Sequence, residues 1–413
     1  MLAHLSLERR RALLSAVALE RFTPNTIVDR DELIRQLDLT KARGYAISID
    51  EQNIGISSVA APVLNHRGEP IGAIGVIGPS FRLPVDRLHA LGRDVIEAAR
   101  RTSGNIGEFA MSIAVQPRPL GPDRADVKCA IPASAFLGEG PHWSIRDQKL
   151  YFVDILAPAV MIGDAASGSY RSLPVPELIG FIVPRERGGF VAAMHGEIRG
   201  LDLDSGETTT IARPEADRPG NRFNDGKCDQ RGRLWAGTLA IDTAPDQGRL
   251  WRIDTDGRSA EMDRGFHVAN GLGWSPDDRV MYFTDTQRQI IYAYDFDAAA
   301  GEIANRRVFI TVPEIEGKPD GMTVDAEGFL WVAHWDGWCV TRYDPDGKVE
   351  RVINLPVPRP TSCVFGGPDM QTLFVTSARI RLSAGQLAEA PLSGSVFSID
   401  TGIKGLPENL YGG

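Results

Sequence analysis

Cysteine is scarce in this sequence of 413 residues, and the cysteines present form no functional pattern. There are four of them, and their spacing matches neither a disulfide framework nor a cysteine metal site. They are Cys129, Cys228, Cys339 and Cys363. We therefore expect reduced thiols and a cytoplasmic protein.

Long apolar runs are also missing, which argues against a membrane-spanning helix. The stretch "ALLSAVALE" follows three arginines. It is too short for a signal peptide and has no clean small-residue cleavage site. An amphipathic helix is the better interpretation, and we expect no membrane contact.

The sequence has no excess of basic residues either. Its net charge is −9, and residues 1–107 carry 14 Lys and Arg against 12 Asp and Glu, so the acidic excess falls in the remainder. Without a basic face, the chain alone is not expected to bind nucleic acid. An acidic domain suits a cation or a neutral substrate, and charge does not choose between them.

Two common catalytic motifs are absent. No Gly-x-Ser-x-Gly sequence occurs, so the nucleophile elbow of many serine hydrolases is not supported. The glycine-rich stretch "GAIGVIG" lacks the turn into a helix that a dinucleotide fingerprint requires. Strand pairing explains it.

The chain divides at a segment with three prolines and no sustained periodicity, residues 108–128, which we interpret as a linker. Before it, helical spacing over 6–17, 30–44 and 85–107 flanks two strands within 57–79. Residues 1–107 are therefore predicted to form a small α+β unit. Residues 129–413 are predicted to form a separate, mainly β domain.

A repeat dominates the second part. Six segments with bulky apolar residues recur at spacings of 40, 44, 47, 49 and 43 residues. Their marker residues are Leu150, Phe190, Leu234, Met281, Leu330 and Leu373. Short strands and Gly or Asp turns repeating every 40–50 residues indicate a β-propeller. We predict six blades, with the strand "KCAIPA" completing the last blade and closing the ring.

Polar residues recur at one position of this repeat. Residues ten or eleven before each marker should begin the strand nearest the propeller axis. They are Glu139, Gly180, Asn224, Asn270, Asp320 and Cys363. A single Asn-Gly or Asp-Gly pair is explained by turn chemistry, but carboxylates or carboxamides recur in four of the six positions. Oxygen ligands that converge from several blades are what a hard divalent cation needs.

The motifs "LGEGPHW", "NRFNDGKCDQRGRLWAGT", "VANGLGWSPDDRVMYFTDT" and "KPDGMTVDAEGFLWVA" resemble the gluconolactonase/regucalcin family, also called the senescence-marker-protein family. The resemblance implies a six-bladed propeller with one divalent metal ion in the central channel and hydrolysis of sugar lactones. Calcium, zinc, manganese, magnesium and ferrous iron would all suit such a site.

Carried over by motif, the family's metal ligands fall on Glu139, Asn270 and Asp320, and its substrate contacts fall on Arg222 and Asn224. A further acidic substrate contact, usually Glu, falls here on Asp242, whose shorter side chain could change which sugar fits.

Lactone opening needs a polarised carbonyl, an attacking water and a proton acceptor, and Asp320 is the candidate general base. Two alternatives stay open. The propeller could be a non-catalytic module that senses a sugar acid or calcium, or a hydrolase of other esters. The polar "RFND" cluster argues against the second alternative.

The segment "ARGYAISIDEQNIGISSVAAPVLNHRGEPIGAIGVIGPSFRL" resembles the later half of the effector-binding domain of IclR-type regulators. The DNA-binding part of such regulators is absent from this sequence. The resemblance implies ligand sensing or pairing of subunits, so a homo-oligomer formed through the N-terminal part is an expectation.

Overall fold

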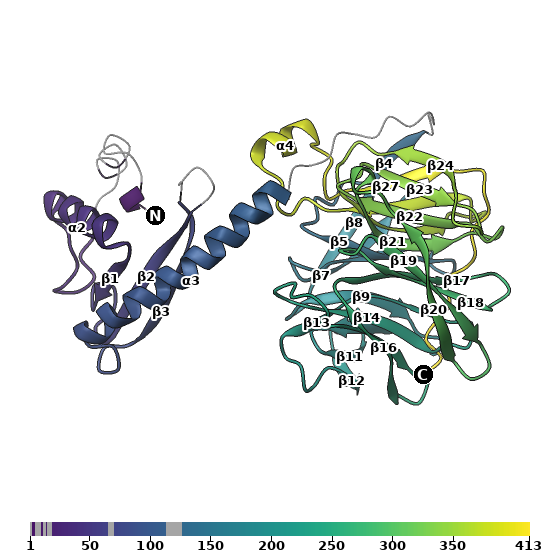
Figure 1. The fold of residues 1–413 in the computed structure, drawn as a ribbon, viewed down its shortest axis with the longest axis horizontal. Coiled ribbons are helices and arrows are strands. Elements are labelled where there is room, and N and C mark those ends of the chain that lie inside the picture. Colours follow the sequence, from purple (N-terminus) through teal and green to yellow (C-terminus); the bar gives the residue numbers. More distant parts are fainter. Residues whose placement is uncertain (1, 5–9, 11–13, 15–18, 65–69, 113–125) are drawn as a thin grey trace. The chain divides into compact units, whose positions relative to one another are not determined.

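The computed structural model describes residues 1–413 except 1, 5–9, 11–13, 15–18, 65–69 and 113–125 (Figure 1). The chain forms two compact units, Met1–Ala114 and Val115–Gly413. None of the helices described is both long enough and apolar enough to cross a bilayer.

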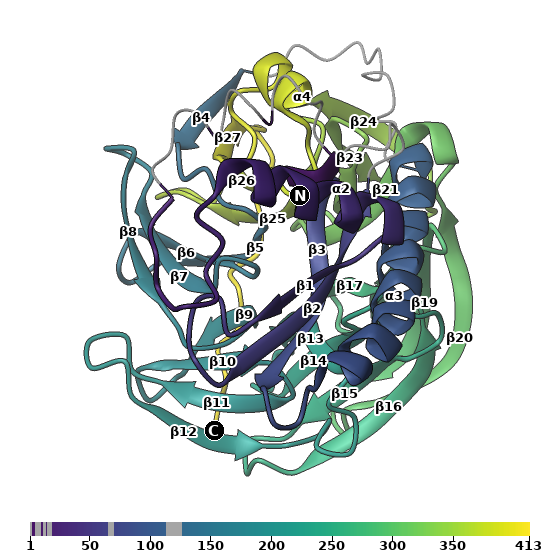
Figure 2. The ribbon, with the colours of Figure 1, turned by 90° about the vertical axis from the view of Figure 1, so that its left-hand side faces the viewer.

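The first unit is a small α+β domain, as predicted. Its antiparallel sheet has the strand order β1-β2-β3, and helix α3 packs against β2 (Figures 1 and 2). Val59, Ala61 and Val63 of β2 are buried because alternate residues of a strand point to the same face. The elements are η1 (Leu2–His4), α2 (Arg30–Arg43), β1 (Ala46–Ile49), β2 (Ile56–Leu64), β3 (Pro70–Pro79) and α3 (Val85–Ser112).

Helix α2 begins and ends where its sequence predicts. The Asp29 side chain caps its first turn by accepting from the Glu32 amide, and Gly44 ends it in the left-handed conformation. Helix α3 continues past residue 107 to Ser112. The predicted helix over 6–17 and most of the predicted linker fall largely outside the described residues.

The second unit contains six four-stranded antiparallel sheets, which confirms the predicted six-bladed propeller. The first three blades are β5 (Gly138–Ser144), β6 (Lys149–Asp154), β7 (Ala159–Asp164) and β8 (Ser169–Pro174); β9 (Ile179–Pro184), β10 (Phe190–Met194), β11 (Glu197–Leu201) and β12 (Thr208–Ala212); and β13 (Asn221–Cys228), β14 (Leu234–Ala240), β15 (Gly248–Ile253) and β16 (Ser259–Phe266).

The last three blades are β17 (Ala269–Trp274), β18 (Val280–Asp285), β19 (Ile290–Asp297) and β20 (Glu302–Thr311); β21 (Lys318–Val324), β22 (Leu330–Trp335), β23 (Cys339–Tyr343) and β24 (Val349–Asn354); and β25 (Pro360–Gly366), β26 (Thr372–Ser377), β27 (Val396–Asp400) and β4 (Val127–Ile131). Two short helices lie in connecting segments, η2 (Glu314–Glu316) and α4 (Ala384–Glu389).

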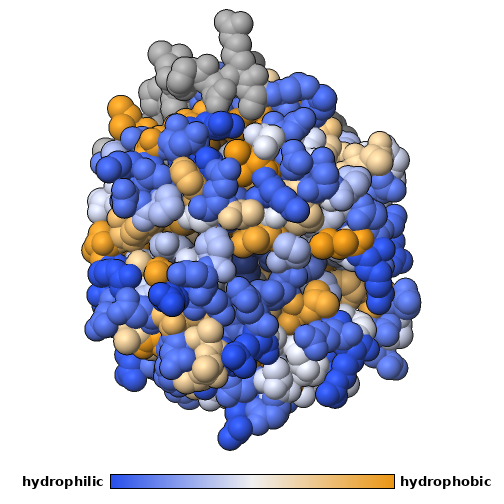
Figure 3. Space-filling model, turned by 90° about the vertical axis from the view of Figure 1, so that its right-hand side faces the viewer, coloured by the Kyte–Doolittle hydropathy of each residue, from blue (hydrophilic) through white to orange (hydrophobic). Residues whose placement is uncertain are grey.

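Strand β4 closes the ring. It pairs with β27, so the first strand of the second unit completes the sixth blade, as predicted. The sheets are arranged around a central axis (Figure 2). One face of the molecule, seen in Figure 3, is mainly hydrophilic with scattered hydrophobic residues.

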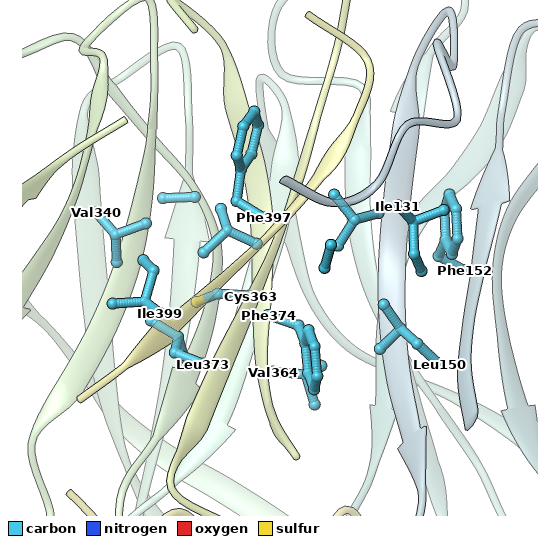
Figure 4. Packing of buried hydrophobic residues seen from close by; sticks show 14 of the residues in the cluster. Ile131, Leu150, Phe152, Val340, Cys363, Val364, Leu373, Phe374, Phe397 and Ile399 are labelled. Carbon is cyan, nitrogen blue, oxygen red and sulfur yellow. The ribbon is translucent and has the colours of Figure 1, made fainter. Parts of the chain in front are cut away.

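The first strand of each blade lines the central channel. Each of these inner strands contacts the inner strand of the next blade, and β25 contacts β5 to complete the circuit. The hydrophobic core lies between the sheets. Figure 4 shows side chains of the sixth blade, including Leu373 and Phe397, with Leu150 and Phe152 of the first blade, which belong to the same buried cluster.

Candidate active site

The inner strands share an irregularity at one level. In five of the six blades, two residues of the inner strand face a single residue of the second strand. The pairs that face one residue are Gly140–Pro141, Asn224–Asp225, Asn270–Gly271, Asp320–Gly321 and Thr361–Ser362. Such β-bulges re-aim side chains and are common beside active sites.

Counting back from the marker residues picks the wrong inner-strand residue in one blade, the sixth. Asn224, Asn270 and Asp320 each stand four residues before the strand partner of their marker, whereas Cys363 stands two residues before the partner of Leu373. The connection from the inner strand to the marker is longer in the sixth blade, and Thr361 therefore occupies the equivalent position. Cys363 instead lies in the hydrophobic core, where its thiol donates to the Trp331 carbonyl at 3.2 Å.

Asn270 and Asp320 meet across neighbouring blades. Asn270 Nδ2 donates to Asp320 Oδ1, and the same amide nitrogen donates to Thr286 Oγ1 at 3.1 Å. Asn270 Oδ1 is buried and has no hydrogen-bond partner. Because a buried polar atom without a partner is costly, this oxygen is a candidate ligand.

Glu139 and Asp320 are buried carboxylates that act on each other electrostatically. Burial, followed by the charge of Asp225, raises the pKa of Glu139 from 4.5 to about 8. Burial, followed by the charge of Glu139, raises the pKa of Asp320 well above its ordinary value. A cation between these carboxylates would relieve both effects.

The three side chains fit a hard divalent cation. Two carboxylates and an amide oxygen without a partner form the oxygen-donor set that such ions prefer. Within the described part of the chain, no group of three or more His, Cys, Asp or Glu side chains is arranged to hold a metal ion. The candidate set has two such side chains and takes its third donor from Asn270.

Arg222 and Asn224 lie beside this set. Arg222 Nη1 donates to Asn224 Oδ1 at 2.8 Å, and Asn224 Nδ2 donates to the carbonyl of Ala269 at 2.9 Å. Ala269 directly precedes Asn270, so these bonds connect the third blade to the fourth. Burial lowers the pKa of Arg222 to about 10, while the charges of Glu139 and Asp320 oppose that shift.

Asp242 is placed differently from the other predicted site residues. It lies in the exposed connection after β14, where its Oδ1 accepts from the Ala244 amide at 3.0 Å. It follows the Asn221–Ala240 strand pair closely, so it lies on the same rim of the blade as Arg222. Hydrogen bonds and charge interactions connect the other five predicted residues to one another. In the described part of the chain, none of these connecting interactions involves Asp242. The five connected residues are Glu139, Arg222, Asn224, Asn270 and Asp320.

Sequence reasoning assigned no individual role to two residues of the site. Asp225 is buried, its Oδ2 has no hydrogen-bond partner, and its charge acts on Glu139 and Asp320. Its neighbour Asn224 was the available signal, because a bulge can turn both residues of a pair inward. Thr286, which holds the Asn270 amide, lies after the second strand of its blade and carries no such signal.

Comparison with known proteins decides the family. Residues 137–379 match the family described as SMP-30/Gluconolactonase/LRE-like region. The chain belongs to this family. Regucalcin of Danio rerio is 38% identical over 291 residues, which cover 70% of this chain and 98% of the relative.

Two further SMP-30/gluconolactonase relatives match over the same share of the chain. The 6-deoxy-6-sulfogluconolactonase of Pseudomonas putida is 38% identical, and the match covers 70% of this chain and 99% of the relative. The crystal structure of the calcium-binding protein regucalcin from Agrobacterium tumefaciens is 29% identical, with a TM-score of 0.67 and coverage of 70% of this chain and 97% of that one.

The N-terminal resemblance is confirmed as well. Residues 1–104 match the family described as bacterial transcriptional regulator IclR C-terminal. The SMP-30/gluconolactonase match and the IclR match do not overlap.

Proposed function

We propose that this chain is a metal-dependent lactonase that opens an aldonolactone ring to the sugar acid. The observation that carries the proposal is the meeting of Asn270 with Asp320, in the electrostatic field of Glu139, at the level where the inner strands bulge. Family membership supports the lactonase assignment, since one relative is named as a sulfogluconolactonase. The relatives named regucalcin, one titled a calcium-binding protein, support a divalent ion.

Glu139, Asp320 and Asn270 Oδ1 would hold the ion. A bound divalent cation polarises a carbonyl and lowers the pKa of a water molecule. Calcium, zinc, manganese, magnesium and ferrous iron are the candidates, and the oxygen-only donor set favours the harder ions.

Asp320 is the proposed general base. It would accept a proton from the water that attacks the lactone carbonyl carbon, and it would return a proton to the ring oxygen as the carbon–oxygen bond breaks. Its place beside Asn270 fixes one carboxylate oxygen, so the second oxygen is the one assigned to the proton.

Arg222 and Asn224 are the proposed substrate contacts. Their mutual hydrogen bond presents a guanidinium and an amide on one strand. Sugar hydroxyls need several donors and acceptors, because polar groups left unpaired in a closed site are costly. Asp242, on the same rim, would contact a more distant hydroxyl of a bound sugar.

A second candidate function is a non-catalytic sensor of a sugar acid or calcium. The observation that favours it is the match of residues 1–104 to the C-terminal region of IclR regulators.

This unit is also the proposed place of homo-oligomer contact, because β3 is an edge strand and exposes Ile77. A full-length chain that stays monomeric in gel filtration would contradict the oligomer.

Proton release from a panel of aldonolactones separates the two functions. A lactonase releases one proton per ring opened, at a rate proportional to enzyme concentration and above the uncatalysed rate. A sensor binds the sugar acid without turnover. Stoichiometric binding with no rate enhancement on any lactone of the panel would replace the lactonase with the sensor.

A further inference from the structure

Three blades carry a cationic side chain at the same level of the inner strand. The position lies two residues before the first residue of the β-bulge, and it is occupied by Arg222 in the third blade, Lys318 in the fifth and Arg359 in the sixth. The corresponding residues of the first and fourth blades are Gly138 and Val268. Since Arg222 belongs to the candidate active site, the strand register places Lys318 and Arg359 at the level of that site.

Arg359 is paired within the fold. Its Nε donates to Asp336 Oδ1 at 2.6 Å, and its side chain is 1% exposed. Its guanidinium also lies 4.8 Å from the centre of the Trp335 ring. A buried guanidinium with a carboxylate partner and a stacked aromatic ring has a structural explanation, so Arg359 is not the candidate for binding a ligand.

Lys318 has a neutral partner instead. Its Nζ donates to Gln287 Oε1 at 2.6 Å, and no carboxylate of the residues that the structure describes lies within salt-bridge distance of it. Asp336 and Glu314 act on its charge from further away. The side chain is half-buried. Because a charge that is partly removed from water is unfavourable without a counter-ion, an anion bound beside Lys318 would be stabilising.

Two links place the Lys318 ammonium beside the candidate metal ligands. Along β21, Lys318 precedes Asp320 by two residues, which separates their backbones by about 7 Å. From the neighbouring blade, Gln287 directly follows Thr286, whose hydroxyl accepts from the Asn270 amide at 3.1 Å. The ammonium is therefore held from both sides near the Asn270–Asp320 pair.

Arg222 and Lys318 flank the fourth blade. Arg222, in the third blade, donates to Asn224, which in turn donates to the Ala269 carbonyl of the fourth. Lys318, in the fifth blade, donates to Gln287 of the fourth. Sugar hydroxyls can be bound by neutral donors, whereas two cationic donors at one level match a negatively charged group.

Both cations lie toward the end of the channel opposite to the last residues of the chain. The backbone of residues 404–413 bonds to Gly232 and Met370, which follow the inner strands β13 and β25. Arg222 and Lys318 stand instead near the beginning of their inner strands. A ligand that enters from this end meets the two cations before it reaches the candidate metal ligands.

We propose that Lys318 binds a negatively charged group of the substrate, a phosphate, sulfonate or carboxylate on the carbon chain of the lactone beyond its carbonyl. The inference rests on the proposed lactonase function and deepens it, because it makes an anionic sugar lactone the preferred substrate class. Lys318 takes no part in opening the ring. It determines which lactone binds.

Lactones that differ in one substituent test the proposal. The panel consists of gluconolactones with a hydroxyl, a phosphate or a sulfonate at carbon 6, or with carbon 6 oxidised to a carboxylate. We expect the full chain to show a higher kcat/KM on at least one charged lactone than on the neutral one, and the panel identifies which anion is preferred. A wild type that uses the neutral lactone as well as every charged one would overturn the proposal.

Variants at Lys318 separate charge from structure. Lys318→Gln keeps a donor for Gln287, and it should lower kcat/KM on the preferred charged lactone about 10–100-fold, the usual effect of losing a hydrogen bond to a charged group, with little change on the neutral lactone. Lys318→Arg keeps the charge and should retain the preference. Equal losses on both lactones in Lys318→Gln would assign Lys318 to the fold and overturn the proposal.

A surface lysine and added salt provide the controls. Lys348→Gln removes an exposed lysine that pairs with Asp346, and it should leave every kcat/KM unchanged. If Lys318→Gln does not fold, the wild type still gives an answer, because salt screens charged contacts. Its kcat/KM on the charged lactone should fall with ionic strength while that on the neutral lactone stays constant, and equal salt dependence would overturn the proposal.

Binding of sugar acids distinguishes failure of this inference from failure of the lactonase. If no lactone of the panel is hydrolysed, the proposed function is contradicted, and calorimetry then compares gluconate with its 6-phosphate, 6-sulfonate and 6-carboxylate counterparts. The wild type should bind at least one of these more tightly than gluconate, and Lys318→Gln should lose the difference. Equal affinities in the wild type would overturn the role of Lys318.

Discussion

Asn270 and Asp320, which lie 50 residues apart in the chain, are joined by a hydrogen bond from Asn270 Nδ2 to Asp320 Oδ1 across neighbouring inner strands. The bond leaves Asn270 Oδ1 buried without a partner. Since Glu139 acts on the same aspartate, the three residues form one electrostatic unit, and most predictions below follow from it.

A rise in pH should destabilise the metal-free protein, whereas a bound metal ion should stabilise it. In the metal-free protein the pKa of Glu139 is raised from 4.5 to about 8 and that of Asp320 is raised too. Between these values the folded chain binds more protons than the unfolded chain, so stability falls as pH rises from about 4.5 to about 8.

A bound ion displaces those protons, so metal affinity should increase over the same pH interval. Thermal melting across this interval, with chelator and with metal, measures both effects. A metal-free melting temperature that rises between pH 5 and pH 8 would contradict the raised carboxyl pKa values on which this expectation depends.

Thr286 should set metal affinity through Asn270. Thr286→Val removes the acceptor of the Asn270 amide, and we expect the ion to bind about 10–100-fold more weakly, the usual effect of losing a group that orients a ligand. Thr284→Val is the matched control, because Thr284 Oγ1 is buried without a partner and its loss should be nearly neutral. Isothermal titration calorimetry measures the metal affinity of both variants. Equal affinities in Thr286→Val and Thr284→Val would contradict a role of Thr286 in orienting Asn270.

Replacing Arg222 should change turnover and metal binding in opposite directions. Arg222→Met removes the donor to Asn224 and a positive charge that lies near both carboxylates. We expect kcat/KM to fall about 10–100-fold, the cost of a hydrogen bond to a charged group, while metal affinity increases. Arg279→Met, at an exposed and weakly paired position, should change neither. A parallel loss of metal would show that Arg222 acts through the fold instead.

Tyr411 should anchor the C-terminal strap, residues 404–413, whose backbone bonds to four blades of the propeller. Its ring is buried in the core of the second and third blades, and its hydroxyl donates to the Asp254 carbonyl at 2.8 Å. Tyr411→Phe should cost about 1 kcal/mol for the lost hydrogen bond, and Tyr411→Ala about 3–5 kcal/mol for the cavity. Denaturant unfolding measures the free energy of unfolding of both variants. If both values equal that of the wild type, the strap does not unfold together with the propeller.

The repeat and the inner-strand chemistry could be predicted from sequence because each depends on local spacing. Markers such as Leu150 and Leu330 recur with the blades, and the positions of Asn270 and Asp320 follow from counting along one hairpin. The count failed at Cys363, where a longer hairpin shifts the register and Thr361 takes the position. Periodicity does not report the length of an individual turn.

Residues that act across long separations could not be found in this way. Glu408 reaches Lys227 from 181 residues further along the chain, and no repeat connects the strap to the third blade. Asp225 was hidden for another reason, since strand alternation would place it opposite Asn224. The β-bulge cancels that alternation, and a bulge is visible only in the paired strands.

The most direct test of the account measures proton release from an aldonolactone by chelated protein, before and after single metals are restored. We expect chelation to abolish turnover, one of the candidate divalent ions to restore it at one equivalent per chain, and Asp320→Ala to stay inactive with every ion. Undiminished turnover after complete chelation, or full activity of Asp320→Ala, would contradict the metal-dependent lactonase.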